Sequence, residues 1–244
     1  MPSPPGSTLD LARAARARRI EAVLLDMDGT ILEYIIDYDL GRARALRRIR
    51  EAVPGADAVE IAARSAREIV RSLGAALGER AASVARRIIF EEYEAVEVEA
   101  ARRVEPRPGA IDALEELRAS GYRVALVTNN SRRAVGLIAS RFPRMMELLD
   151  AVVTRDDSME LKPGASGLRM ALQALGVPGE RSVMAGDTPS DVRAGRSVGA
   201  LTVGIEGGAA SAGDLLEAGA EFIVGSPREL SRALRIARHP GSPY

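Results

Sequence analysis

Cysteine is absent from this chain of 244 residues, and histidine occurs only once, as His239 near the C-terminus. Without cysteine there are no disulfides, thiolate nucleophiles or sulfur ligands for a metal ion. A lone histidine in a terminal segment argues against a histidine general base, a Ser/His/Asp triad and an imidazole metal site. Any catalysis must therefore depend on carboxylates, hydroxyls, lysine, arginine or a hard cation.

Lysine and the amide residues are also rare. All but one of the 34 basic residues are arginine, the exception being Lys162, and the only asparagines are Asn129 and Asn130. Few thermolabile amides together with abundant Arg and Glu are typical of a thermophile protein, although a GC-rich genome would also favour arginine over lysine. A chain that almost never uses Lys or Asn retains them at two places, which become candidates for function.

The charges balance, with 34 basic against 34 acidic residues. This balance indicates neither nucleic acid nor an anionic membrane as a partner. No apolar run is long enough to cross a bilayer, and the N-terminus has no apolar stretch before a small-residue cleavage site. We therefore expect a cytoplasmic protein; its oligomeric state is open, and a homodimer is one expectation.

Short apolar runs rich in branched residues alternate with helical patterns, which predicts βαβ units and a parallel sheet. The expected fold class is α/β, with a Rossmann-like parallel sheet flanked by helices. The predicted strands are 22–25, 123–127, 151–154, 182–185, 200–205 and 221–224, and the predicted helices of this core are 108–120, 132–141, 164–176, 189–198, 211–218 and 227–238.

One interval interrupts the alternation. Residues 35–102 contain no convincing strand and instead show amphipathic patterns over 40–53, 59–77 and 79–100. This predicts an all-helical cap inserted after the first strand, over the acidic residues that follow it. The expected organisation is a flexible N-terminal segment (1–18), a core (19–34 and 103–238), the cap (35–102) and a flexible tail (239–244).

Asp26 and Asp28 follow the first apolar strand in the segment DMDGT. Ligands of open α/β sheets bind at the carboxyl ends of the strands, so both acids would lie at the mouth of the sheet. An aspartate can attack phosphorus as a nucleophile, and a nearby carboxylate can serve as general acid and base. The simpler interpretation is a turn or helix cap, which aspartate often provides.

Two further segments contain the rare residues. Thr128, Asn129 and Asn130 end the strand 123–127, where a hydroxyl and free backbone amides suit a phosphate oxygen; the alternative is a helix cap at Asn130 or Ser131. Lys162 would offer a compact cation to a phosphoryl group, which the planar fork of arginine does not match. The alternative for Lys162 is a solvent-exposed lysine at a helix start.

The fourth segment is GDTPSD, which follows the strand 182–185. Asp187 would lie at the strand end, and Asp191 would reach back from the next helix. Carboxylates in such a position are ligands that Mg²⁺ accepts. Helix capping would explain Asp187 but not both aspartates.

These four segments, in this order, resemble the motifs of the haloacid dehalogenase superfamily, and the resemblance extends over residues 20–238. It implies that Asp26 is the nucleophile that forms an aspartyl-phosphate and that Asp28 is the general acid and base. It further implies that Thr128 and the backbone of Asn129 bind the phosphoryl group and that Lys162 neutralises its charge.

The same resemblance implies a Mg²⁺ cofactor. Its ligands would be Asp26, the backbone carbonyl of Asp28 and Asp187, with Asp191 either a ligand or the partner of Lys162. The resemblance also favours phosphoryl transfer over dehalogenation, because dehalogenases of this superfamily lack the second aspartate, which is Asp28 here.

The helical cap resembles that of phosphoglycolate phosphatases and related phosphatases of small metabolites. The expected activity is therefore hydrolysis of a small phosphomonoester, with phosphoglycolate as the first candidate. A sugar phosphomutase with the same nucleophile and a non-catalytic binding module on the same fold are the alternatives. Glu33 and Tyr34 stand where many relatives carry an Asp-Ser pair, and this departure concerns the substrate rather than the chemistry.

Overall fold

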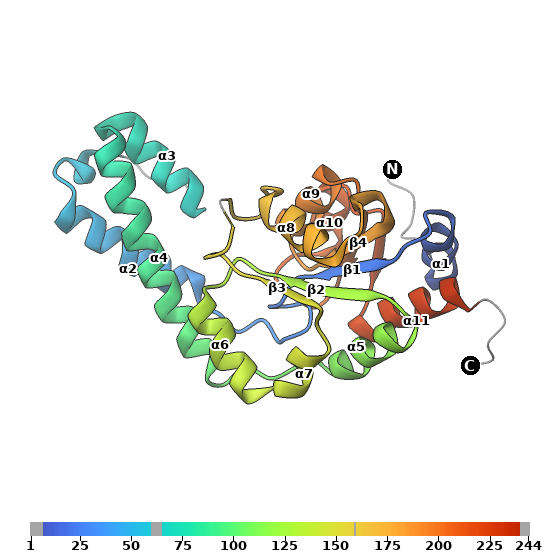
Figure 1. Ribbon diagram of the computed structural model, residues 1–244. Helices are drawn as coiled ribbons and strands as arrows, with labels where there is room; N and C mark the ends of the chain where they lie inside the picture. The colour runs from blue at the N-terminus through green and yellow to red at the C-terminus, as the bar shows by residue number, and fades with distance from the viewer. Residues whose placement is uncertain (1–6, 60–64, 159, 240–244) are drawn as a thin grey trace. The chain divides into compact units, whose positions relative to one another are not determined.

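The computed structural model describes residues 7–59, 65–158 and 160–239. Six parallel strands form one sheet in the order β3-β2-β1-β4-β5-β6 (Figure 1). This is the strand order of a doubly wound Rossmann sheet, in which ligands bind where the order reverses, beside β1. The predicted fold class is thus confirmed. The strands are β1 (Ala22–Leu25), β2 (Arg123–Val127), β3 (Ala151–Val153), β4 (Ser182–Gly186), β5 (Leu201–Ile205) and β6 (Phe222–Val224).

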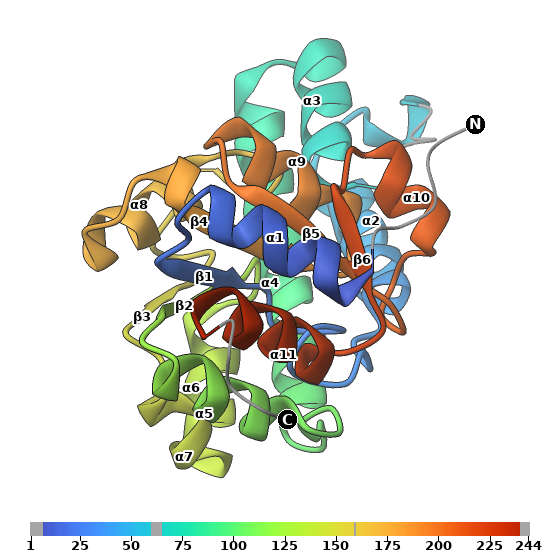
Figure 2. The ribbon, with the colours of Figure 1, turned by 90° about the vertical axis from the view of Figure 1, so that its right-hand side faces the viewer.

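Helices cover both faces of this sheet. α8 (Ser166–Leu175) and α9 (Pro189–Ser197) lie on one side, whereas α5 (Ala110–Ala119) and α11 (Pro227–Arg238) lie on the other (Figures 1 and 2). Coverage of both faces explains why β1 is apolar at every position, since each of its side chains is buried. The other helices that follow the sheet strands are α6 (Arg132–Arg141), α7 (Pro143–Glu147) and α10 (Ala212–Glu217).

In the core under α8, alternate side chains of β1 and β2 point to the same face of the sheet. Ala22 and Leu24 of β1 join Ala125 and Val127 of β2 in one buried cluster with Leu168 of α8. Every second residue of these strands therefore packs on this side, as the two-residue period of a strand requires. The short α7 was not among the predicted helices.

The N-terminal segment, which the sequence analysis expected to be flexible over residues 1–18, contains a helix in the structure. Residues Thr8–Ala17 form α1, which packs on α11 and buries Leu11 to 1% exposure. Ser7 caps the helix in a reciprocal pair with Asp10. Its buried stripe consists largely of alanines between arginines. Small side chains give a weak hydrophobic pattern but allow helices to approach closely. Residues 1–6, and 240–244 of the predicted tail, lie outside the described residues.

A second compact unit comprises Ile36–Arg103. Its helices are α2 (Tyr38–Ala52), α3 (Ala66–Leu77) and α4 (Glu79–Ala101), with a 3-10 turn at Ala56–Ala58, and its described residues include no strand. Its core is built from apolar side chains of all three helices, among them Ile49, Ile69, Leu73, Ile88 and Ile89. The insertion is helical, as predicted, although residues 60–64 of the predicted helix 59–77 lie outside the described residues. Across the described ranges of the whole chain, no helix combines the length and apolarity needed to cross a bilayer.

Candidate active site

Three of the predicted site segments follow adjacent strands. Leu25 of β1 is paired with Leu126 of β2, and β4 pairs with β1 on its other side, all in parallel. Asp26, Thr128 and Asp187 each come directly after one of these strands. Because parallel strands end at the same edge of a sheet, the three residues lie at one edge, beside the point where the strand order reverses.

The loop after β1 is shaped by a glycine and braced by two side chains. Gly29 has φ +72°, and a Cβ on it would lie 2.1 Å from Oδ2 of Asp187, so neither the conformation nor the space admits another residue. The Thr30 hydroxyl donates to Oδ1 of Asp187 at 3.3 Å, and the Arg107 guanidinium donates to the Gly29 carbonyl. The sequence analysis assigned no role to Thr30, although Thr30 belongs to the DMDGT motif. No feature of the sequence distinguished Arg107 from the other arginines.

Lys162 lies at the centre of the acidic groups. Its ammonium donates to Oδ1 of Asp26, donates to the Val127 carbonyl at 2.7 Å and pairs with Oδ1 of Asp191 at 2.7 Å. Two of these contacts are hydrogen bonds, to Asp26 and Val127, and the third, to Asp191, is an ion pair. The side chain is only 5% exposed, so the alternative of a solvent-exposed lysine is wrong. The planar guanidinium of arginine would not meet three acceptors converging on one point.

Asp187 and Asp191 have different surroundings. Thr188, not Asp187, caps α9: its hydroxyl oxygen accepts from the Asp191 N–H, and Oδ2 of Asp191 accepts from the Thr188 N–H at 3.0 Å. The capping interpretation therefore applies to Asp191 and fails for Asp187. Oδ1 of Asp191 is turned toward Lys162, while Oδ2 of Asp187 accepts from the Ala209 N–H at 2.7 Å.

Burial and mutual repulsion perturb these groups. Burial raises the pKa of Asp26 well above its ordinary value; the Lys162 charge opposes this shift, and the charges of Asp191 and Asp187 add to it. Burial and the Asp191 charge raise the pKa of Asp187 to about 6. Burial alone would lower the pKa of Lys162, but the charges of Asp191 and Asp26 outweigh it and raise that pKa. One lysine does not balance three buried acids.

The acids fit a divalent cation. Asp26, Asp187 and Asp191 each offer a carboxylate oxygen, and these oxygens lie within 4.8 Å of one another. All three residues are buried. Hard oxygen ligands of this kind suit Mg²⁺ or Ca²⁺, and a cation would offset the excess negative charge. The side chain of Asp28 does not belong to this group.

The two asparagines hold other site residues through their side chains. Oδ1 of Asn129 accepts from the Lys162 N–H at 2.9 Å, and its Nδ2 donates to the Lys162 carbonyl at 3.2 Å. Nδ2 of Asn130 donates to Oδ2 of Asp28 at 2.8 Å. Their rarity identified this place in the sequence, but only the backbone of Asn129 received a role; the side-chain partners are far away along the chain.

The loop that contains the asparagines is itself well braced. Oγ1 of Thr128 accepts from the Asn130 N–H at 3.1 Å, and Ser131 caps α6, so the helix-cap alternative applies to Ser131. The buried Arg155, which lies shortly after β3, binds this loop. Its guanidinium donates to the Asn129 carbonyl at 3.2 Å, and its backbone N–H donates to the Asn130 carbonyl at 2.9 Å. Arg155 was also missed by the sequence analysis.

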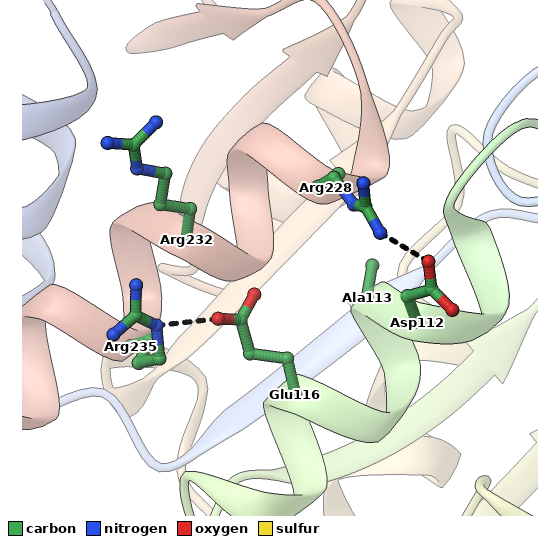
Figure 3. A pocket seen from close by; sticks show the side chains of 6 residues that line it. All are labelled: Asp112, Ala113, Glu116, Arg228, Arg232 and Arg235. Carbon is green, nitrogen blue, oxygen red and sulfur yellow. Dashed lines mark hydrogen bonds and ion pairs between the residues drawn. The ribbon is translucent and has the colours of Figure 1, made fainter. Parts of the chain in front are cut away.

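A separate hollow of about 370 Å³ lies between α5 and α11 (Figure 3). Three arginines of α11 face two acids of α5 there, and Arg228 pairs with Asp112 while Arg235 pairs with Glu116 at 2.6 Å. Residues from the four motifs do not line it. The acidic cluster, rather than this hollow, is therefore the candidate active site.

Comparisons with known proteins identify the family of the chain. The profile of the family described as "Hydrolase: haloacid dehalogenase-like hydrolase" matches residues 20–199, which is more than half of the chain. Pyrophosphatase PpaX of Bacillus cereus (strain AH820) is 32% identical over 117 residues, covering 48% of this chain and 47% of the relative. The chain thus spans about half the length of this curated relative.

Two further similarities extend over more of the chain. Pyrophosphatase PpaX of Bacillus velezensis is 27% identical over 192 residues, covering 77% of this chain and 84% of the relative. CbbY from Rhodobacter sphaeroides, solved in complex with phosphate, is 26% identical with a TM-score of 0.59, over 86% of this chain and 96% of that one. CbbY has also been solved with xylulose-(1,5)bisphosphate. With the ordered motifs at one edge of the sheet and a profile match over residues 20–199, the chain belongs to the haloacid dehalogenase-like hydrolase family.

Proposed function

We propose that this protein is a Mg²⁺-dependent phosphatase that hydrolyses a small phosphomonoester through a phosphoryl group carried on Asp26. The observation that supports it best is the buried contact between Lys162 and Asp26, with Asp187 and Asp191 beside them. An acid held in place at the end of a sheet strand, next to one cation and two further acids, matches the needs of phosphoryl transfer.

In the first half of the reaction, a carboxylate oxygen of Asp26 attacks phosphorus. A bond from Asp26 to phosphorus forms while the bond to the leaving oxygen breaks, and Asp28 gives its proton to that oxygen. In the second half, Asp28 takes a proton from water, which attacks the same phosphorus. Inorganic phosphate leaves and the Asp26 carboxylate is regenerated.

Two donors are available for the phosphoryl oxygens. The Thr128 hydroxyl oxygen accepts one hydrogen bond, and within the described ranges its own hydrogen has no acceptor. The N–H of Asn129 likewise has no acceptor within the described ranges. These groups follow β2 at the same edge of the sheet where Asp26 follows β1, which supports their assignment as phosphoryl ligands.

Asp26, the Asp28 carbonyl, Asp187 and Asp191 would hold the Mg²⁺ ion. When bound, Mg²⁺ supplies positive charge that offsets both the clustered carboxylates and the phosphoryl oxygens. Lys162 keeps Asp26 and Asp191 in place with or without the ion.

The substrate belongs to the class of small phosphorylated metabolites. Phosphoglycolate is the first candidate from the sequence, and pyrophosphate and sugar bisphosphates enter from the names of the relatives. A panel that includes all of these, with phosphate release measured with and without Mg²⁺, will rank them by kcat/KM.

The decisive variant is Asp26→Asn, which keeps the size of the side chain and removes the nucleophile. We expect phosphate release to fall by at least about 10³-fold. The matched control is Asp57→Asn in the helical unit, an aspartate whose side chain is 79% exposed, and it should retain wild-type rates. Activity that survives in Asp26→Asn would exclude the proposed nucleophile.

Two other outcomes have distinct signatures. A sugar phosphomutase would convert a sugar 1-phosphate into the 6-phosphate and release little phosphate. A binding module would bind Mg²⁺ and hydrolyse no member of the panel. Either outcome would replace the phosphatase proposal.

A further inference from the structure

The side chain of Asn129 holds the backbone of Lys162 at both of its polar groups. Oδ1 of Asn129 accepts from the Lys162 N–H at 2.9 Å, and Nδ2 donates to the Lys162 carbonyl at 3.2 Å. We propose that Asn129 is the positioning residue for Lys162, and that this paired contact keeps the Lys162 ammonium against Asp26 during phosphoryl transfer. This inference rests on the proposed function.

The backbone of Lys162 has little other support. Lys162 lies in the loop between β3 and α8, outside any helix or strand. Among the residues that the structure describes, the Asn129 side chain makes the only hydrogen bonds to its N–H and carbonyl. The loop is therefore free to shift at this residue once the Asn129 side chain is removed.

Both ends of Lys162 are attached to the end of β2. The ammonium donates to the Val127 carbonyl at 2.7 Å, and the backbone is held two residues further along, at Asn129. Asn129 is itself anchored, because its carbonyl accepts from the guanidinium of the buried Arg155 at 3.2 Å. This anchor fixes where the lysine side chain starts, and thus which acceptors its ammonium reaches.

An amide side chain suits this contact because it carries one acceptor and one donor side by side. The backbone of a single residue presents the complementary pair, an N–H and a carbonyl. Aspartate would accept from the N–H but place a second oxygen against the carbonyl. A serine side chain is shorter, so its hydroxyl would lie farther from both groups.

The same loop offers a matched control in Ser158. Its hydroxyl donates to the Glu160 carbonyl at 2.6 Å and accepts from the Glu160 N–H at 3.3 Å. Ser158→Ala therefore also removes a donated and an accepted bond to the backbone of one residue, and neither bond involves Lys162. A general loss of loop bracing should affect Ser158→Ala and Asn129→Ala alike.

Because Lys162 is the only lysine of the chain, its side chain can be followed directly by nuclear magnetic resonance. Protein made with isotope-labelled lysine gives one set of ε-methylene signals. In the wild-type protein in EDTA, a fixed ammonium should give the two ε protons separate chemical shifts. In Asn129→Ala, and in Asn129→Ser as a second variant, the two signals should merge towards the shift of free lysine, whereas Ser158→Ala should keep them separate.

The kinetic measurement is kcat/KM for p-nitrophenyl phosphate at saturating Mg²⁺. A misplacement of about 1 Å can cost about 10²-fold in rate. We expect a loss of about tenfold to a hundredfold for Asn129→Ala and of less than about threefold for Ser158→Ala. Urea titrations should show that both variants are folded.

Merged ε signals in the wild-type protein, or separate ones in the Asn129 variants, would overturn the proposal. Merged signals with unchanged activity would also overturn it, because the contact would then have no bearing on the reaction. Asp26→Asn tests the other premise: if it still hydrolyses the substrate, the proposed function fails, whereas the ε signals report on Lys162 without any catalysis. If Asp26→Asn is inactive and Asn129→Ala behaves like Ser158→Ala, only this inference fails.

Discussion

Replacing Lys162 by methionine tests whether the buried lysine holds the acidic cluster together. Methionine nearly preserves the length and volume of lysine, so the variant removes charge without opening a large cavity. In its place, Asp26 and Asp191 would face each other with no cation within the buried group. Removing one partner of a buried ion pair costs about 3–5 kcal/mol, because it leaves an uncompensated charge.

The free energy of unfolding should fall by that amount at pH 8 in EDTA. For a chain of this size, 1 kcal/mol corresponds to about 2–4 °C in Tm, so the midpoint should drop by roughly 6–20 °C. Urea titrations followed by far-ultraviolet circular dichroism are suitable, since the chain has no tryptophan. The deficit should shrink at pH 5, where the acids of raised pKa take up protons and no longer need a cation.

The control is Arg228→Met, which breaks an ion pair with Asp112 at the surface (Figure 3). The Arg228 side chain is 65% exposed, and such pairs contribute at most about 1 kcal/mol. Burial, not the number of ion pairs, should therefore separate the two variants. A Lys162→Met protein as stable as Arg228→Met at pH 8, or equally destabilised at pH 5 and pH 8, would refute the reasoning.

Three further predictions concern the metal site and the N-terminal helix. The pKa of Asp187 is raised from 3.8 to about 6, so between these pH values the folded protein binds more protons than the unfolded chain. The free energy of unfolding in EDTA should therefore fall by about 3 kcal/mol as the pH rises through this window. Added Mg²⁺ should abolish the fall. Gly29→Ala should weaken Mg²⁺ binding in calorimetry at least tenfold, because its Cβ would lie 2.1 Å from Oδ2 of Asp187; unchanged affinity would contradict the geometry. Leu11→Ala should destabilise the protein by about 2–5 kcal/mol in urea titrations, because Leu11 is 1% exposed in α1; a loss below about 0.5 kcal/mol would mean that α1 adds nothing to the fold.

The strands were the easiest elements to predict. Each predicted strand lies within one residue, at either end, of the strand in the structure, because the strands are apolar runs bounded by turn signals. The N-terminal helix gave a weaker signal for the opposite reason: its buried stripe consists of alanines around Leu11. Patterns of hydrophobicity reveal large buried side chains better than small ones.

The site residues divide in a similar way. Asp26 and Asp187 follow strands, so their common edge could be inferred from parallel pairing alone. Arg107 and Arg155 could not be found, since nothing distinguishes them from the other arginines until the fold brings them to the loops after β1 and β2.

The sequence by itself determined the sheet, the helical insertion and the place of the acids, because these follow from local periodicity and from where the strands end. The rarity of lysine and asparagine also indicated the loops that contain Asn129, Asn130 and Lys162. Only the tertiary structure decided how these residues are paired: Lys162 with Asp26 and Asp191, Asn129 with the Lys162 backbone, and Asn130 with Asp28. Their partners are separated by many residues in the chain, and hydrogen bonds of a few ångströms depend on the folded path of the backbone, which no local pattern encodes.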